Sequence, residues 1–175
     1  MENNQAYTIR NAKPEEFKKI GALIVQVYSQ LEGFPNASEQ PAYYNKLSNV
    51  GDLTNNGETE LLVAVSSDNT ICAAVVYFSD MQYYGSGGIA TQEKNVSGFR
   101  LLAVDPTSRG HGIGKLLTNK CIEKARKFKH QQVIIHSTKS MKIAWSMYEN
   151  LGFLRSKDLD FVQGDLHVYG FRLKL

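Results

Sequence analysis

Apolar positions recur along this chain at two spacings, and the spacing predicts where helices and strands lie. Residues 7–10 have the pattern of a short strand, and Pro14 followed by two acidic residues suits the first turn of a helix. Helical spacing then continues through Phe17, Ile20, Leu23, Ile24 and Val27. Residues 32–56 are polar and interrupted by prolines and glycines, and a short second helix is expected among them around Tyr43, Tyr44 and Leu47.

Two runs rich in valine, leucine and isoleucine, residues 60–65 and 70–78, predict an antiparallel hairpin because the turn-forming residues 66–69 separate them. A segment rich in glycine and tyrosine, residues 81–97, comes next. It is either a surface loop packed by its own tyrosines or a loop that faces a substrate. The sequence leaves both interpretations open.

The second half of the chain predicts strands that alternate with helices. Residues 99–104 form an apolar run that ends at Asp105 and Pro106, because proline lacks the N–H that a strand ladder needs. A helix follows, with one apolar face made by Leu116, Leu117, Cys121 and Ala125. Residues 133–136 predict another strand, placed for a βαβ crossover.

The last quarter of the chain predicts one more helix and two strands. The helix has an apolar stripe and is closed by Gly152 as its C-terminal cap. Two final strands are expected, one from Phe153 onward and one over residues 167–173, with residues 162–165 between them. The residues of the helix stripe are Ile143, Ala144, Met147, Tyr148 and Leu151.

Composition favours one α/β domain over residues 1–175, since the length suffices for one core and no linker divides the chain. The formal net charge is +3, and basic residues are interspersed with acidic ones except in residues 124–130. That tract is interpreted as the solvated end of a helix, so no nucleic-acid partner is expected. Cys72 and Cys121 lie far apart in apolar surroundings and are predicted to be buried free thiols.

No apolar run approaches the ~20 residues of a membrane-spanning helix. The first residues, Met1 to Asn4, lack the basic and apolar regions of a signal peptide. A cytoplasmic protein without a membrane partner is therefore expected.

A glycine-rich turn joins the central strand to its helix and is a candidate anion site. The first N–H groups of a helix lack internal partners and the helix dipole favours negative charge there, while glycine lets a ligand approach the backbone. A P-loop would need Gly in place of Arg109 and Ser or Thr in place of Leu116, and a dinucleotide fingerprint would need Gly in place of Lys115. Both of these alternatives are disfavoured.

The pattern Arg109-x-x-Gly112-x-Gly114, after a strand that ends Val-Asp-Pro, resembles the signature of the GCN5-related N-acetyltransferase (GNAT) family. The later run Tyr148-x-x-x-Gly152-Phe153 resembles the end of the family's next helix. Many members carry Asn three residues before Ala144, where this chain has Met141, a variant found within the family. The resemblance is specific over residues 99–153 and general over most of the remainder.

The resemblance implies a mixed, mostly antiparallel central sheet flanked by helices, with a splayed parallel strand pair at an acetyl-CoA site. The glycine-rich turn would offer backbone N–H groups to the CoA pyrophosphate, and no metal is required. The preceding strand would pair with the pantetheine arm, and the N–H of Val104 would polarise the thioester carbonyl. The cofactor-binding residues implied are Leu102, Ala103, Val104, Arg109, Gly110, His111, Gly112, Ile113, Gly114 and Lys115.

The activity implied is direct transfer of an acetyl group from acetyl-CoA to a primary amine of a small molecule or amino-acid-like acceptor. By resemblance Tyr148 would donate a proton to the departing CoA thiolate, although a tyrosine on an apolar helix stripe can also be a core residue. His111 is expected to face solvent or CoA without acting as acid or base. His136 is interpreted as a hydrogen-bonded structural histidine.

The sequence does not decide which group takes the proton of the acceptor amine or which amine is the acceptor. Some relatives use a Glu where Gly98 stands, and Arg100 shares that face of the strand, either as a cation on the substrate side or in a structural salt bridge. The amine could lose its proton through ordered water or to Glu32, Glu58 or Glu60. The acceptor is expected to contact Arg100, Tyr83, Tyr84 and Phe34.

Two alternatives to the small-molecule enzyme also stay open, and both a monomer and a homodimer are compatible with the sequence. A peptide or protein N-acetyltransferase would be favoured by an open groove lined with acidic residues, and a small acceptor by an enclosed pocket. A catalytically silent acyl-CoA-binding module is favoured by the missing Glu at Gly98 and opposed by the presence of Tyr148.

Overall fold

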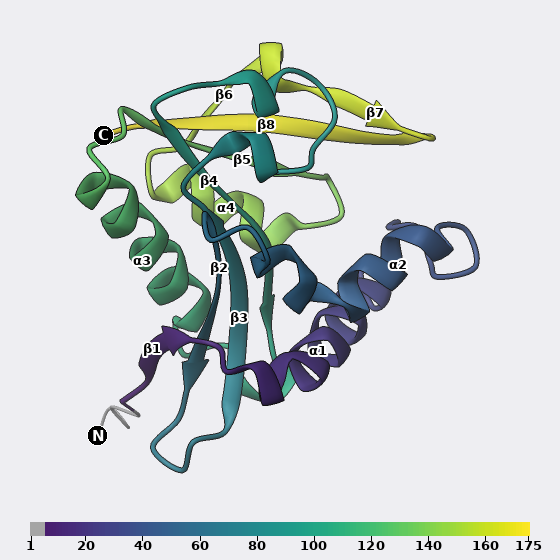
Figure 1. The fold of residues 1–175 in the computed structure, drawn as a ribbon. Coiled ribbons are helices and arrows are strands. Elements are labelled where there is room, and N and C mark those ends of the chain that lie inside the picture. Colours follow the sequence, from purple (N-terminus) through teal and green to yellow (C-terminus); the bar gives the residue numbers. More distant parts are fainter. Residues whose placement is uncertain (1–5) are drawn as a thin grey trace.

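A twisted eight-stranded sheet runs through the protein in the order β1-β2-β3-β4-β5-β8-β6, with β7 paired to β8 (Figure 1). The computed structural model describes residues 6–175, so the expectation drawn from Met1 to Asn4 lies outside the described residues. The β4–β5 pair is parallel and the other pairs are antiparallel, which confirms the predicted mixed sheet. The strands are β1 (Thr8–Asn11), β2 (Thr59–Val65), β3 (Ile71–Phe78), β4 (Val96–Val104), β5 (Gln132–Ser137), β6 (Leu154–Arg155), β7 (Phe161–Gln163) and β8 (Leu166–Lys174).

Four α-helices cover the two faces of this sheet within the described residues: α1 (Phe17–Ser29), α2 (Pro41–Ser48), α3 (Ile113–Lys127) and α4 (Lys142–Asn150). In Figure 1, α3 lies on the opposite side of β2 and β3 from α1 and α2. The predicted helices and the predicted hairpin are confirmed, including the short helix around Tyr44. None of these helices is long and apolar enough to cross a membrane, within the part of the chain that the structure describes.

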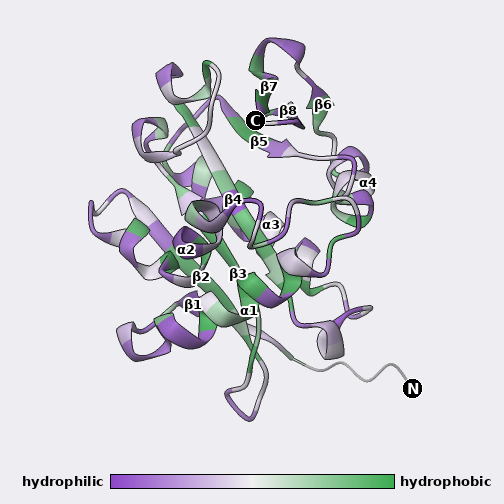
Figure 2. Cartoon of the chain, turned by 90° about the vertical axis from the view of Figure 1, so that its right-hand side faces the viewer, coloured by the Kyte–Doolittle hydropathy of each residue, from purple (hydrophilic) through white to green (hydrophobic). Residues whose placement is uncertain are grey.

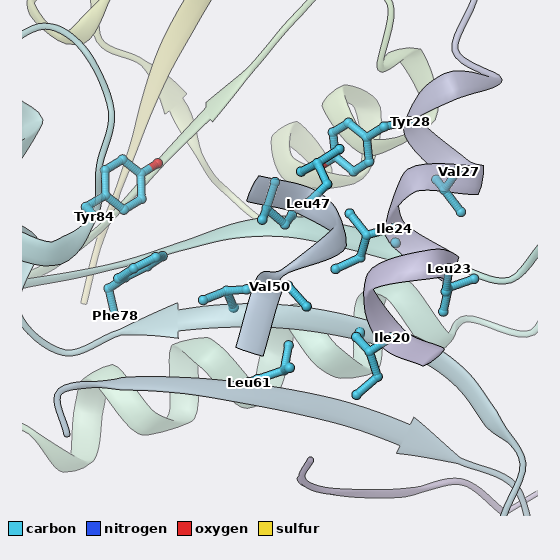
Figure 3. Packing of buried hydrophobic residues seen from close by; sticks show 14 of the residues in the cluster. Ile20, Leu23, Ile24, Val27, Tyr28, Leu47, Val50, Leu61, Phe78 and Tyr84 are labelled. Carbon is cyan, nitrogen blue, oxygen red and sulfur yellow. The ribbon is translucent and has the colours of Figure 1, made fainter. Parts of the chain in front are cut away.

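Two separate hydrophobic clusters result, one on each face of the sheet. Alternate residues of β2 enter different clusters: Leu61 and Val63 face α1 and α2, whereas Leu62 faces α3. Strands covered on both faces are apolar throughout instead of alternating, which explains the continuous runs in the sequence. Figure 2 shows this as hydrophobic colour along the central strands, and Figure 3 shows Ile20 and Ile24 of α1 in the first cluster with Leu61.

The end of the chain differs from the prediction of two strands. Three strands form, because residues 161–163 pair with the start of β8 around a tight turn at Gly164, which has a φ of +60°. Val162 and Gln163, expected between the strands, therefore belong to β7. The resulting β7–β8 hairpin extends to the start of α2, on the face of the sheet that α1 and α2 cover. There Gln163 Nε2 donates to Oε1 of Gln40, the residue before α2, at 3.2 Å.

Candidate functional site

The parallel strands β4 and β5 separate partway along their length. Their pairing runs from Val96 opposite Gln132 to Gly98 opposite Ile134, yet β4 continues to Val104 and β5 to Ser137. The edge of β4 beyond Gly98 that faces β5 has no strand partner among the described residues. An extended ligand can pair with such an edge as an added strand would.

A backbone irregularity directs the side chains along this free edge. Leu101 has a φ of +59°, and the register between β3 and β4 shifts between Ala74 and Val76. Because of this bulge, Arg100 and Leu101 line the same cavity instead of pointing to opposite faces of the sheet. Leu102 and Val104 pack on the α3 and α4 side.

The glycine-rich turn follows β4 and leads directly into α3. The Asp105 carboxylate accepts the N–H of Thr107 at 2.9 Å and so fixes the turn before it. Gly110 and Gly112 have φ values of +83° and +73°, and a side chain on either would meet no described atom within 4 Å. Gly112 is the residue before the first turn of α3, whose N–H groups have no partners within the helix. The turn is therefore an open anion site.

Basic side chains surround this turn. Arg109, His111 and Lys115 are exposed, and His111 Nδ1 lies 3.1 Å from the carbonyl oxygen of Ser108. A groove of about 550 Å³ begins beside them and runs along α4. The groove is lined by Lys115, Lys142, Ile143, Ser146, Met147, Asn150 and Leu151.

Two apolar positions of the predicted helix faces are not buried. Ile143 is 85% exposed and lines the groove, and Leu116 is 42% exposed. The helices were placed correctly by their periodicity, but no element of the described chain covers these two side chains. An exposed isoleucine between Lys115 and Lys142 is suited to a ligand that has both apolar and anionic parts.

A second cavity, of about 80 Å³, lies on the other side of β4 and β5. Its walls come from the α1–α2 region, from β4 and β5, from the start of α4 and from the β7–β8 hairpin. Of the described residues that line it, Arg100 is the one cation and none is acidic. The aromatic rings around it are those of Tyr28, Phe34, Tyr43 and Phe161.

Arg100 faces this cavity and makes no structural salt bridge among the described residues. Its Nη1 donates to the carbonyl oxygen of Tyr84 at 2.7 Å, and its guanidinium carbon lies 5.5 Å from the centre of the Tyr84 ring. The interpretation of Arg100 as part of a structural salt bridge is therefore wrong, and its place on the substrate side stays a prediction.

Tyr84 and His136 form a buried support beneath Arg100. Because a carbonyl can only accept, His136 Nε2 donates to Leu159 O at 2.9 Å and Nδ1 accepts from the Tyr84 hydroxyl at 3.0 Å. Burial lowers the pKa of His136 to about 4, so the ring is neutral near pH 7. Both ring nitrogens are occupied, which confirms the structural interpretation of His136.

Tyr83 and Tyr84, expected to contact the acceptor, lie outside the lining of this cavity, and that contact stays a prediction. Tyr84 is wholly buried and Tyr83 is 38% exposed, and neither lines the cavity. The segment 81–97 is mainly a loop packed by its own tyrosine. Phe34, in contrast, does line the cavity and packs edge-on against Tyr28 at 5.6 Å.

Tyr148 lies on α4 against Phe99, the residue directly after the last position at which β4 pairs with β5. The ring centres of Tyr148 and Phe99 are 5.8 Å apart, and Phe153 packs on Tyr148 at 5.7 Å. Burial raises the pKa of Tyr148, so its phenol stays protonated. Within the described chain the Tyr148 hydroxyl makes no hydrogen bond. Its oxygen is not completely buried, so a ligand or solvent can reach it. The hydroxyl is a free donor near the point where the two strands separate.

The carboxylates suggested as bases lie elsewhere. Glu32 and Glu58 are exposed, and Glu60 pairs with Lys124 at 2.9 Å on the α3 side of the sheet. None of the three lines the cavity, which disfavours each of them as the group that takes the acceptor's proton there.

Most residues that line the cavity were not expected as site residues from the sequence, among them Tyr28, Tyr43 and Thr138. Tyr43 was expected only as part of the short second helix, and Tyr28 lies one residue beyond the apolar positions expected for the first helix. Thr138 is 3% exposed, and its Oγ1 is fully buried without a hydrogen-bond partner in the described chain. No group of three or more His, Cys, Asp or Glu side chains suited to a metal occurs among residues 6–175.

An anion turn next to a parallel strand pair that opens is suited to an extended, phosphate-bearing ligand. Residues 24–153 match the acetyltransferase (GNAT) family. The chain belongs to this family, as the resemblance in its sequence implied. A curated relative, N-alpha-acetyltransferase 30 of Saccharomyces cerevisiae, is 35% identical over 57 residues. This match covers 33% of the chain and about a third (32%) of the relative's length.

Solved structures of low sequence identity share the fold. A GNAT acetyltransferase from Staphylococcus aureus Mu50 has a TM-score of 0.74 at 18% identity, with 97% of this chain and 99% of that chain covered. The Salmonella typhimurium protein yncA, a putative acetyltransferase solved with its cofactor acetyl-CoA, has a TM-score of 0.68 at 16% identity. The match covers 97% of this chain and 94% of that chain. The PaiA N-acetyltransferase of Thermoplasma acidophilum, in complex with coenzyme A, has a TM-score of 0.71 at 13% identity. The match covers 94% of this chain and 98% of that chain.

Proposed function

We propose that the protein is an acetyl-CoA-dependent N-acetyltransferase that moves the acetyl group directly to a primary amine of a small or amino-acid-like acceptor. One observation carries the proposal: the free edge of β4 lies between the anion turn and a small, partly open cavity, and Tyr148 lies against β4 where β5 leaves it. Donor and acceptor would then approach the same strand from two sides.

The donor would be bound by backbone and basic groups. The N–H groups of the turn, with Arg109 and Lys115, suit the CoA pyrophosphate, and the groove beside Ile143 suits the rest of the nucleotide. The pantetheine arm would pair with the backbone of Leu102, Ala103 and Val104. The N–H of Val104 would then polarise the thioester carbonyl.

The transfer makes one bond and breaks one. The amine nitrogen attacks the thioester carbonyl carbon, so that a C–N bond forms and the C–S bond breaks. The Tyr148 phenol donates its proton to the departing sulfur and regains one from solvent, while water takes the proton that the amine nitrogen loses. A buried phenol that stays protonated supports this role as the acid.

The acceptor would enter the cavity without help from a carboxylate base. None of the described residues that line the cavity is acidic, so the ammonium form of an amine finds no stabilising carboxylate there, which favours the neutral, nucleophilic form. Ordered water is then sufficient as the proton acceptor, which is the remaining alternative from the sequence.

The cavity also bears on the rival functions. A small space without acidic lining residues supports a small acceptor over a peptide, although the curated yeast relative is named as an N-alpha-acetyltransferase. The free phenol of Tyr148 supports an enzyme over a silent acyl-CoA-binding module. A cytoplasmic location and a monomeric or homodimeric state stay predictions.

Two measurements test the function. Saturating acetyl-CoA should raise the unfolding temperature, because a ligand that binds only the native state stabilises it. An amine panel followed by release of the free CoA thiol should then show turnover. The proposal fails if acetyl-CoA produces no thermal shift, and binding without turnover on any amine would favour the silent module.

A further inference from the structure

Resting on the proposed function, we infer that Arg100 binds an acidic group of the acceptor, so that the enzyme acetylates amines that also carry a carboxylate. The acceptor class is therefore the free amino acids and close analogues. Polyamines, aminoglycosides and lysine side chains are excluded.

The first reason is the unused donors of Arg100. Nη1 donates to Tyr84 O, and the other guanidinium N–H groups have no partner among the described residues. No acidic side chain of residues 6–175 lines the cavity that the guanidinium faces. A half-buried guanidinium with free donors is matched in geometry by a planar carboxylate, which accepts two parallel hydrogen bonds.

The second reason is the set of hydroxyl groups around Arg100. Tyr28, Tyr43 and Arg100 line the same cavity, and burial raises the pKa of both tyrosines, so their phenols stay protonated. Neither phenol hydroxyl has a hydrogen-bond partner in the described chain. Thr138 Oγ1, in the same cavity, is buried and unpaired. A buried polar atom such as Thr138 Oγ1 is normally satisfied, and the two phenol hydroxyls are unpaired donors, so the cavity is suited to an acceptor-rich ligand such as a carboxylate.

The third reason is that Arg100 is held in place before any ligand binds. The Tyr84 carbonyl and ring fix the guanidinium, and the hydrogen bonds from Tyr84 to His136 and from His136 to Leu159 fix Tyr84. Since His136 is neutral, it adds no second charge to the cavity. A fixed cation binds an anion without a large entropic cost of ordering its side chain.

The same features exclude cationic acceptors. A polyamine would bring a second ammonium group near Arg100, and no carboxylate is available to neutralise it. The volume of about 80 Å³ and the aromatic walls favour a small apolar side chain on the amino acid.

The experiment compares matched acceptors on the intact chain with acetyl-CoA as donor. For each of several small apolar amino acids, kcat/KM is measured for the free acid, its carboxamide and its decarboxylated amine, with spermidine as the cationic probe. The kcat/KM of the free acid should exceed that of its carboxamide and that of its decarboxylated amine by about 10- to 100-fold. Both analogues lack the carboxylate and so lose a hydrogen bond between charged groups.

Variants then assign the preference to Arg100. Arg100→Gln should reduce the preference to near unity by raising KM for the acid, while its calorimetric affinity for acetyl-CoA stays unchanged. Arg100→Lys should keep part of the preference, since the charge remains without the planar fork. The exposed Arg126 supplies the matched control, and Arg126→Gln should keep the full preference.

The outcomes separate the two hypotheses. Turnover of carboxamides, decarboxylated amines or spermidine that equals or exceeds that of the acids overturns the role of Arg100 and leaves the proposed enzyme standing. Binding of acetyl-CoA without turnover of any amine overturns both. If Arg100→Gln does not fold, the preference of the wild-type protein and of Arg100→Lys decides the question.

Discussion

The ring of Tyr84 occupies the space that a side chain on residue 98 would need. A Cβ atom at Gly98 would lie 2.8 Å from Cε2 of Tyr84 and 2.8 Å from Sδ of Met81. This chain therefore has no room for a glutamate at position 98, because Tyr84 and Met81 fill the space. The tyrosine that fills its place also supports Arg100 and contacts His136.

Gly98→Ala should lower the free energy of unfolding by about 1–3 kcal/mol, since it overpacks a filled space. Denaturant unfolding measures the loss. Gly114→Ala is the control, because its Cβ would be 3.6 Å from Cγ2 of Val104, an ordinary contact. Equal stability of the two variants would contradict the close approach at Gly98. Gly98→Glu should be at least as destabilising, and should not create an active base.

Tyr148→Phe should lower kcat about 100-fold on a true acceptor, because the phenol proton for the CoA thiolate is lost. Its affinity for acetyl-CoA, measured by calorimetry, should change little since the ring still packs on Phe99 and Phe153. Tyr169→Phe removes a phenol on β8 outside the cavity and serves as the control. Unchanged turnover in Tyr148→Phe would remove Tyr148 from the chemistry.

Gly112→Ala should weaken acetyl-CoA binding. Its φ of +73° is unfavourable for a residue with a Cβ, at a cost of about 1–2 kcal/mol, and relaxation would turn the first N–H groups of α3 away from the ligand. Gly57→Ala is a close match, with a φ of +78° and equally open surroundings far from the turn. Both variants should lose stability, but the dissociation constant for acetyl-CoA should rise in Gly112→Ala alone.

Stability should depend on pH through His136. Burial holds its pKa at about 4 in the native state, below the usual value of 6.5, so the unfolded chain binds a proton first as the pH falls. This contribution is complete above pH 6.5, decreases between 6.5 and 4, and levels off below. Unfolding free energies for the wild-type protein and His136→Gln should therefore converge as the pH falls through that range. His167→Gln, at an exposed position, should follow the wild-type curve, and parallel curves for His136→Gln would contradict the shift.

The order of the elements and the donor side of the site could be predicted from the sequence because both depend on local patterns. Hydrophobic period, turn residues and the spacing of Arg109, Gly112 and Gly114 are all visible in the chain itself. Periodicity does not reveal what covers an apolar side chain, however, so Ile143 and Leu116 were assigned to buried faces although one borders a groove and both are exposed.

The acceptor side could be predicted only in part, since it depends on contacts between distant segments. The adjacent residues Tyr83 and Tyr84 have the same chemistry, and only the fold decides that one of them is buried under Arg100. Glu60 was a plausible base until its partner, Lys124, was found on the other face of the sheet. The bulge at Leu101 also has no signature in the sequence, yet it turns Arg100 and Leu101 toward one cavity.

The walls of that cavity have an evolutionary consequence. The groups proposed to bind acetyl-CoA lie within residues 102–151, whereas much of the cavity wall comes from residues 28–43 and 161–168, which lie outside that stretch on either side. Mutations in these outer segments can reshape the room for the acceptor while the donor machinery is inherited unchanged. New acceptor preferences can thus arise by substitutions in the outer segments. A change to an acceptor without an acidic group would also involve Arg100 of the central strand.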